Sequence, residues 1–109
     1  MELVANDAIV PEIWAFEIAN NIFVSYSKRK RISERQITEY LSLLRALPIR
    51  VEAQSLWANV DLESLARRQS VAAYDAAYLD LALRTGLPLA ASDEPLRRAA
   101  IAQGTAVLA

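Results

Sequence analysis

The sequence has neither cysteine nor histidine among its 109 residues. Without cysteine the chain forms no disulfide and no thiolate metal site, as is typical of a cytoplasmic protein. Without histidine it has no histidine general base, no Ser-His or Cys-His nucleophile pair and no histidine-bound zinc. Carboxylates, hydroxyls and cationic side chains remain for chemistry, and hard oxygen ligands of this kind suit Mg²⁺ or Mn²⁺.

Long apolar runs are absent as well. No run is long enough to cross a membrane, and the N-terminus lacks the basic-then-apolar pattern of a signal peptide. The formal net charge is only −1, so any signal for nucleic-acid binding must be local. The apolar share of 54% is ample for a core, and the length predicts one domain over residues 1–109.

Short apolar segments alternate with helical patterns along the chain. The patterns predict strands at residues 8–10, 49–51, 87–91 and 105–108, and helices at residues 12–27, 34–47, 52–69, 71–85 and 94–103. Strands separated by helices indicate an α/β domain with a mostly parallel sheet and helices on both faces. In such sheets ligands bind outside the carboxyl ends of the strands.

Local signals predict where several elements begin. A turn at Asn6 and Asp7 precedes the first strand, and Pro11 is expected in the first turn of the first helix. Ser33 is expected to cap the helix that follows it, in a capping box. Asp61 is expected to cap a second piece of the helical region 52–69.

The most informative acid is Asp75, in the helix predicted over residues 71–85. At about 100° per residue, Asp75 falls inside the apolar stripe of this helix, which consists of Val71, Tyr78, Leu79 and Ala82. Asp80 points nearly the opposite way, on the side of Arg84. A carboxylate on an apolar face is costly unless it is paired, hydrogen-bonded or bound to a metal. The alternative for Asp75 is an ordinary surface pair with Arg84 or Arg67.

Two further acids have unusual settings. Glu17 lies on a second face of the first helix, between Ile13 and Val24, where an acid that only solvates a helix is not expected. Asp93 follows the strand predicted at residues 87–91, which places it near the binding edge of a parallel sheet. The plainer alternatives are an acid that complements the helix dipole for Glu17 and a helix N-cap for Asp93.

These segments together resemble the PIN-domain ribonucleases, particularly the VapC-type toxins of toxin–antitoxin pairs. The likeness covers nearly the whole chain and rests on VPEIWAFEIAN (residues 10–20), KRKRIS (28–33), YDAAYL (74–79) and LAASDEPL (89–96). It implies an Mg²⁺- or Mn²⁺-dependent endoribonuclease that hydrolyses RNA phosphodiester bonds and is restrained by a VapB-like antitoxin. It also implies a homodimer.

The resemblance implies a role for individual residues. Glu17 and Asp75 would be metal ligands, and Asp93 a ligand or an acid that positions water. Ser92 and Asn20 would support this site. A divalent ion held there would activate a bound water and stabilise charge on the phosphate.

Four consecutive basic residues, Lys28, Arg29, Lys30 and Arg31, follow the first helix. Such a run is usually a solvated helix end, where cations complement the dipole. It could also contact the phosphates of RNA, with an affinity that depends on salt and not on base sequence.

The chain departs from the family in two ways. Ala91 stands where the family usually has threonine. The strand–helix unit that carries the family's first catalytic Asp, on the order of thirty residues, is missing, and Asp7 does not replace it. Because that strand is central in the family's sheet, its absence predicts two half-sheets with exposed edges. We therefore expect an N-terminally truncated PIN-like domain that either dimerises by exchanging elements or is inactive.

Three functions follow from these observations. The first is a metal-dependent endoribonuclease. The second is a catalytically inactive PIN remnant that acts only through self-association or antitoxin binding. The third is a helical adaptor without a metal site, which has no reason to place acids on apolar faces.

Overall fold

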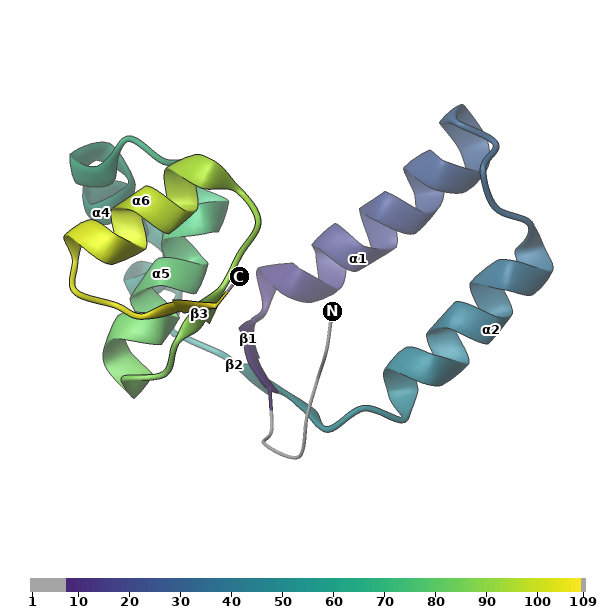
Figure 1. Cartoon of the computed structure of the whole chain (residues 1–109), viewed down its shortest axis with the longest axis horizontal. Helices are drawn as coiled ribbons and strands as arrows, with labels where there is room; N and C mark the ends of the chain where they lie inside the picture. Colours follow the sequence, from purple (N-terminus) through teal and green to yellow (C-terminus); the bar gives the residue numbers. More distant parts are fainter. Residues whose placement is uncertain (1–7, 109) are drawn as a thin grey trace. The chain divides into compact units, whose positions relative to one another are not determined.

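The computed structural model describes residues 8–108, in which short strands alternate with helices (Figure 1). The elements in chain order are β1 (Ala8–Pro11), α1 (Ile13–Phe23), η1 (Val24–Lys28), α2 (Glu34–Arg45), β2 (Ile49–Glu52), α3 (Leu56–Val60), α4 (Leu62–Gln69), α5 (Ala73–Thr85), β3 (Leu89–Ala90), α6 (Glu94–Ala102) and β4 (Val107–Leu108). The predicted mixture of helices and parallel strands is confirmed. The turn predicted at Asn6 and Asp7 lies outside the described residues.

The chain divides into two compact units, residues 1–52 and 53–109. Each unit contains one two-stranded parallel sheet, formed by β1 and β2 in the first and by β3 and β4 in the second. The described strands therefore form two half-sheets, as expected from the missing central strand, and not the single sheet that the strand–helix alternation alone indicates. None of the helices within residues 8–108 is long and apolar enough to cross a membrane.

In the first unit, the pairing of β1 with β2 corrects two predictions. Pro11 is the last residue of β1 and not part of the first turn of α1. It pairs with Glu52, which ends β2 and does not begin a helix. A proline has no N–H to donate to the ladder, and it is therefore tolerated at the end of a strand that borders its sheet.

The helices of the first unit follow the predicted pattern of starts and stops. α1 continues directly into the single π-helical turn η1. α2 begins at the predicted capping box, in which Gln36 N donates to Ser33 Oγ (3.2 Å) and Ser33 N donates to Gln36 Oε1 (2.9 Å). Nevertheless, no described residue of this unit is buried.

The second unit has a closed core between α4, α5 and α6. The buried side chains are small or aliphatic: Leu65, Ala76, Leu79, Ala82, Leu89, Leu96, Ala99 and Ala100. Leu79 in the middle of α5 is completely inaccessible to solvent. α5 ends as predicted at Gly86, whose left-handed backbone (φ 71°) lets its N–H cap the helix on the carbonyl of Ala82.

The helical region that begins the second unit is broken as predicted, but with different caps. Ser55 starts α3, and its Oγ accepts a hydrogen bond from Ala58 N (3.2 Å). Asp61 lies between α3 and α4 with a helical backbone and makes no side-chain cap. An N-cap side chain normally reaches the following amides from an extended backbone. The prediction that Asp61 caps α4 is therefore wrong.

Candidate functional site

Asp75 lies in the first turn of α5, three residues after the N-cap residue Ala72. Its side chain is half-buried, and its neighbours Ala76 and Leu79 are fully buried. This intermediate burial agrees with the predicted position of Asp75 beside the apolar stripe of the helix. The positive end of the helix dipole lies at this turn and favours the ionised form.

The neighbouring acid on α5, Asp80, has a structural role. Arg84 Nε donates to Asp80 Oδ2 (2.7 Å), and Gln54 Nε2 donates to the same oxygen (3.1 Å). This pair lies on the side of α5 predicted for Asp80. It stabilises the last turns of the helix and ties the segment before α3 to α5.

Arg67, the second cation considered as a partner for Asp75, pairs within its own helix. Its Nε donates to Glu63 Oε2 (2.8 Å) one turn earlier on α4. This hydrogen bond lowers the pKa of the Glu63 carboxyl. Both side chains are exposed, so the pair contributes little to stability.

Asp93 is the N-cap of α6, and its side chain is exposed. Leu96 N donates to Asp93 Oδ2 (3.2 Å). The helix N-cap, which is the alternative to a metal ligand for Asp93, is thus observed. Because Oδ1 takes no part in that bond, capping does not prevent a second interaction of the same carboxylate. Ser92, the residue before it, is also exposed.

Asp75 and Asp93 both belong to the second unit, on α5 and at the start of α6. A short turn at Gly86 joins α5 to β3, so β3 runs back along α5 (Figure 1). Asp93 follows the carboxyl end of β3 by three residues. This is the edge of a parallel sheet where ligands bind in α/β proteins.

Arg97 is a residue at this edge that the sequence analysis missed. Its Nη1 donates to the carbonyl oxygens of Ala91 (3.0 Å) and Leu108 (3.0 Å). One guanidinium thus ties the carboxyl ends of β3 and β4 together and places a cation there. The only sequence signal is its position one turn after Asp93 on α6, a spacing typical of acid–base pairs.

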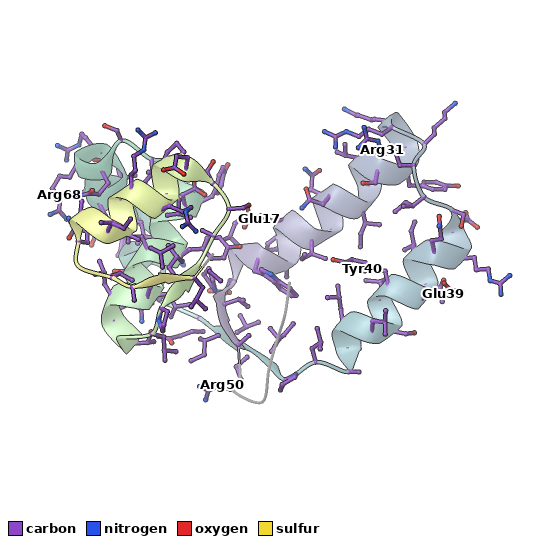
Figure 2. All side chains as sticks on the ribbon, in the orientation of Figure 1. Glu17, Arg31, Glu39, Tyr40, Arg50 and Arg68 are labelled. Carbon is purple, nitrogen blue, oxygen red and sulfur yellow. The ribbon has the colours of Figure 1, made fainter. Side chains whose placement is uncertain are left out.

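Glu17 and Asn20 belong to the first unit. Glu17 is half-buried on α1, and Asn20 is exposed (Figure 2). Hard carboxylate oxygens suit Mg²⁺ or Mn²⁺. However, within residues 8–108 no group of three or more acidic side chains is arranged so that it could hold a metal ion.

The basic run lies at the end of η1 and in the loop that follows. Lys28, Arg29, Lys30 and Arg31 are all exposed, and Figure 2 shows Arg31 at this end of the helix. Lys30 has a left-handed backbone (φ 50°). None of the four side chains has an ion pair or a hydrogen bond to another described residue. The run is therefore an uncompensated positive patch.

A shallow pocket of the second unit lies between the end of α4 and the start of α6. It is lined by residues from the end of α4 and the start of α6: Gln69, Ser70, Pro95, Arg98 and Ala99. It contains none of the predicted site residues.

Comparison with known proteins adds no family. No known family model matches the chain, and no curated protein is significantly similar to it. The resemblance to PIN-domain ribonucleases therefore rests on the four sequence segments alone.

Proposed function

We propose that this chain is a PIN-like, metal-dependent endoribonuclease of the VapC toxin type, which acts in the cytoplasm on RNA and is restrained by a VapB-like antitoxin. The observation that carries the proposal is the half-buried carboxylate of Asp75, beside the fully buried Ala76 and Leu79 on α5. A carboxylate beside buried side chains is kept where it is paired, hydrogen-bonded or bound to a metal. It is expected where the acid has a chemical role.

The proposed metal ligands of the second unit are Asp75 and Asp93, with Ser92 in support. The resemblance adds Glu17 as a ligand and Asn20 in support, and both belong to the first unit. When bound, Mg²⁺ or Mn²⁺ would activate a water and stabilise charge on the phosphate. Asp93 would coordinate through Oδ1 while Oδ2 keeps the cap of α6. Arg97 would keep the strand ends in place and add positive charge beside the carboxylates.

The basic patch of Lys28, Arg29, Lys30 and Arg31 is the proposed contact for the RNA backbone. Its four cations are exposed and lack acidic partners among the described residues. Phosphates would release counterions on binding there, so RNA affinity is expected to fall steeply with salt.

RNA cleavage by the full chain tests this function. Unstructured fluorescent RNA is incubated with the protein and Mn²⁺ or Mg²⁺, with EDTA in parallel. We expect cleavage only with metal, and a loss of more than about a hundredfold in Asp75→Asn, because a lost ligand should cost at least as much as a lost outer contact. Asp80→Asn is the matched control and keeps its activity. Cleavage in EDTA, or equal rates for both variants, would contradict the proposal.

The second candidate is a binding module without catalysis, which acts through self-association or antitoxin binding. It is favoured because, within residues 8–108, no cluster of three or more acidic side chains is arranged so that it could hold a metal ion. If the chain binds an antitoxin but neither cleaves RNA nor binds metal, it is a binding module without catalysis.

A further inference from the structure

The pocket between the end of α4 and the start of α6 has a volume of about 270 Å³ and lies entirely within the second unit. Ala99, which lines it, also belongs to the closed core of that unit, as do Leu65 of α4 and Leu96 of α6. This shared core holds the two helices together. The pocket is therefore a feature of the second unit alone, whatever the position of the first unit.

The charge of the pocket comes from Arg98, its only charged lining residue. Glu94 precedes Arg98 by four residues on α6, a spacing at which acids and bases commonly pair. Yet within residues 8–108 the Arg98 side chain makes neither an ion pair nor a side-chain hydrogen bond. Its guanidinium is thus an uncompensated positive charge in a concave surface. The planar fork of arginine matches two oxygens of an anion such as phosphate.

Ser70 adds a hydroxyl to the pocket from a strained position. It is the C-cap of α4, and its backbone is left-handed (φ 54°, ψ 44°), where glycine is the usual residue. Strain of this kind is often found at ligand sites. The side chains of Ser70 and its neighbour Gln69 make no hydrogen bond with another described residue. A hydroxyl and an amide therefore accompany the guanidinium as hydrogen-bond donors.

We propose that this pocket binds the phosphate group of a small molecule. The guanidinium of Arg98 pairs with two phosphate oxygens, and Ser70 Oγ and Gln69 Nε2 donate to the same group. A phosphate monoester offers three strong acceptor oxygens, enough for all three donor side chains, whereas a carboxylate offers only two. The volume lies just below the range of about 300–1,000 Å³ for drug-sized ligands, so it suits free phosphate or a small phosphate ester.

The pocket shares no residue with the proposed metal ligands or with the basic patch on the first unit. Phosphate binding at Arg98 needs no metal ion, because the cation is supplied by the protein. This inference therefore goes beyond the proposed nuclease function, and the failure of either one would leave the other standing.

Nuclear magnetic resonance of the full chain tests the site by titration with inorganic phosphate and, separately, with phenyl phosphate. EDTA is present to exclude metal, and chloride keeps the ionic strength constant. We expect saturable shifts of the amides at residues 69–70 and 98–99, with millimolar affinity. If phenyl phosphate binds more tightly, the ligand is a phosphate ester; if inorganic phosphate does, it is free phosphate. The absence of saturable shifts with both would overturn the proposal.

Two arginine variants separate contact from charge. Arg98→Gln should weaken phosphate binding by at least about tenfold, because it removes a charge-assisted pair of hydrogen bonds. Arg68→Gln is the matched control: it removes the same charge from an exposed position on α4 that does not line the pocket, and it should bind nearly as well as the wild type. Equal losses in the two variants would contradict a site at Arg98.

Ser70→Gly distinguishes a ligand from a merely structural residue. Glycine adopts the left-handed backbone without strain, so this variant should unfold at a higher temperature than the wild type. It also lacks the hydroxyl and should bind phosphate roughly two- to tenfold more weakly. Greater stability with unchanged phosphate affinity would contradict the assignment of Ser70 to the site.

Discussion

Asp75 and Asp80 show that helical periodicity predicts on which side of a helix a single residue lies. Both are aspartates of α5, but Asp75 is half-buried beside the core and Asp80 is hydrogen-bonded to Arg84 on the opposite side. The sequence predicts this difference because the angle per residue fixes the side of each acid once the helix forms. The same reasoning explains why Asp75 and not Asp80 is the candidate ligand.

Asp93 is expected to carry a measurable structural role besides any chemistry. Asp93→Ala removes the hydrogen bond that Leu96 N donates, and it should lower the free energy of unfolding by about 1 kcal/mol. Asp93→Ser restores a cap without a carboxylate and should be nearly as stable as the wild type. Urea denaturation distinguishes the two variants. If serine is as destabilising as alanine, the cap is not what Asp93 contributes to stability.

Two residues show what periodicity and capping signals miss. Asp61 has the sequence of an N-cap, but α3 and α4 meet there with a continuous helical backbone, so its side chain does not cap. Arg97 holds the carbonyls of Ala91 and Leu108, and that contact exists only after β3 and β4 have paired. Tertiary contacts of this kind leave no periodic signal in the sequence.

At the scale of elements, α1 is the least predictable helix because it is apolar on two sides. Ala15, Phe16, Ala19 and Phe23 form an apolar stripe along one side of α1, and all four are exposed. A stripe predicts burial only when the opposite side is polar. Helix starts and stops were easier to predict, since the capping box at Ser33 and the Gly86 stop depend on local contacts alone.

The capping box at Ser33 is expected to contribute a larger share of the stability of α2 than a cap contributes to a well-packed helix. Since no residue of α2 is buried, its stability depends on local interactions. Ser33→Ala should therefore destabilise α2 by about 1 kcal/mol, visible as lower helicity by circular dichroism and weaker amide protection at residues 34–45. Ser42→Ala, in the exposed middle of the same helix, is the control and should not lower helicity. Equal helicity of the two variants would contradict this role for Ser33.

For the whole molecule, strand–helix alternation predicts the parallel pairing, whereas the division into two half-sheets is expected only from the family resemblance. Strand–helix alternation indicates parallel strands, and each half-sheet has them. Alternation does not indicate how many strands join one sheet, because that depends on contacts between distant segments. The core follows the same division: it is closed in residues 53–108 and absent from the described part of residues 1–52.

This unequal burial predicts two levels of stability. In dilute solution, amides of α5 and α6 should exchange orders of magnitude more slowly than those of α1 and α2, because local opening is easiest where few apolar contacts are lost. Hydrogen exchange followed by mass spectrometry measures this directly. Uniform protection over both units in dilute solution would contradict this prediction.

The fully buried Leu79 provides the matching variant for the second unit. Leu79→Ala should cost about 2–5 kcal/mol and raise exchange throughout α4, α5 and α6, since it leaves a cavity in the only closed core of the described residues. The exposed Leu83, on the same helix, is the control and should tolerate alanine with little change. A Leu79→Ala variant with wild-type exchange in α6 would show that this core is not cooperative.

Titration of Mn²⁺ into the full chain, followed by calorimetry, tests the central claim most directly. We predict saturable binding to the wild type, unchanged binding to Asp80→Asn, and an affinity at least about tenfold lower for Asp75→Asn. Asp80→Asn carries the same loss of one charge on the same helix, so it separates coordination from a general charge effect. The absence of saturable binding, or equal affinities for the two variants, would contradict the assignment of Asp75 as a metal ligand.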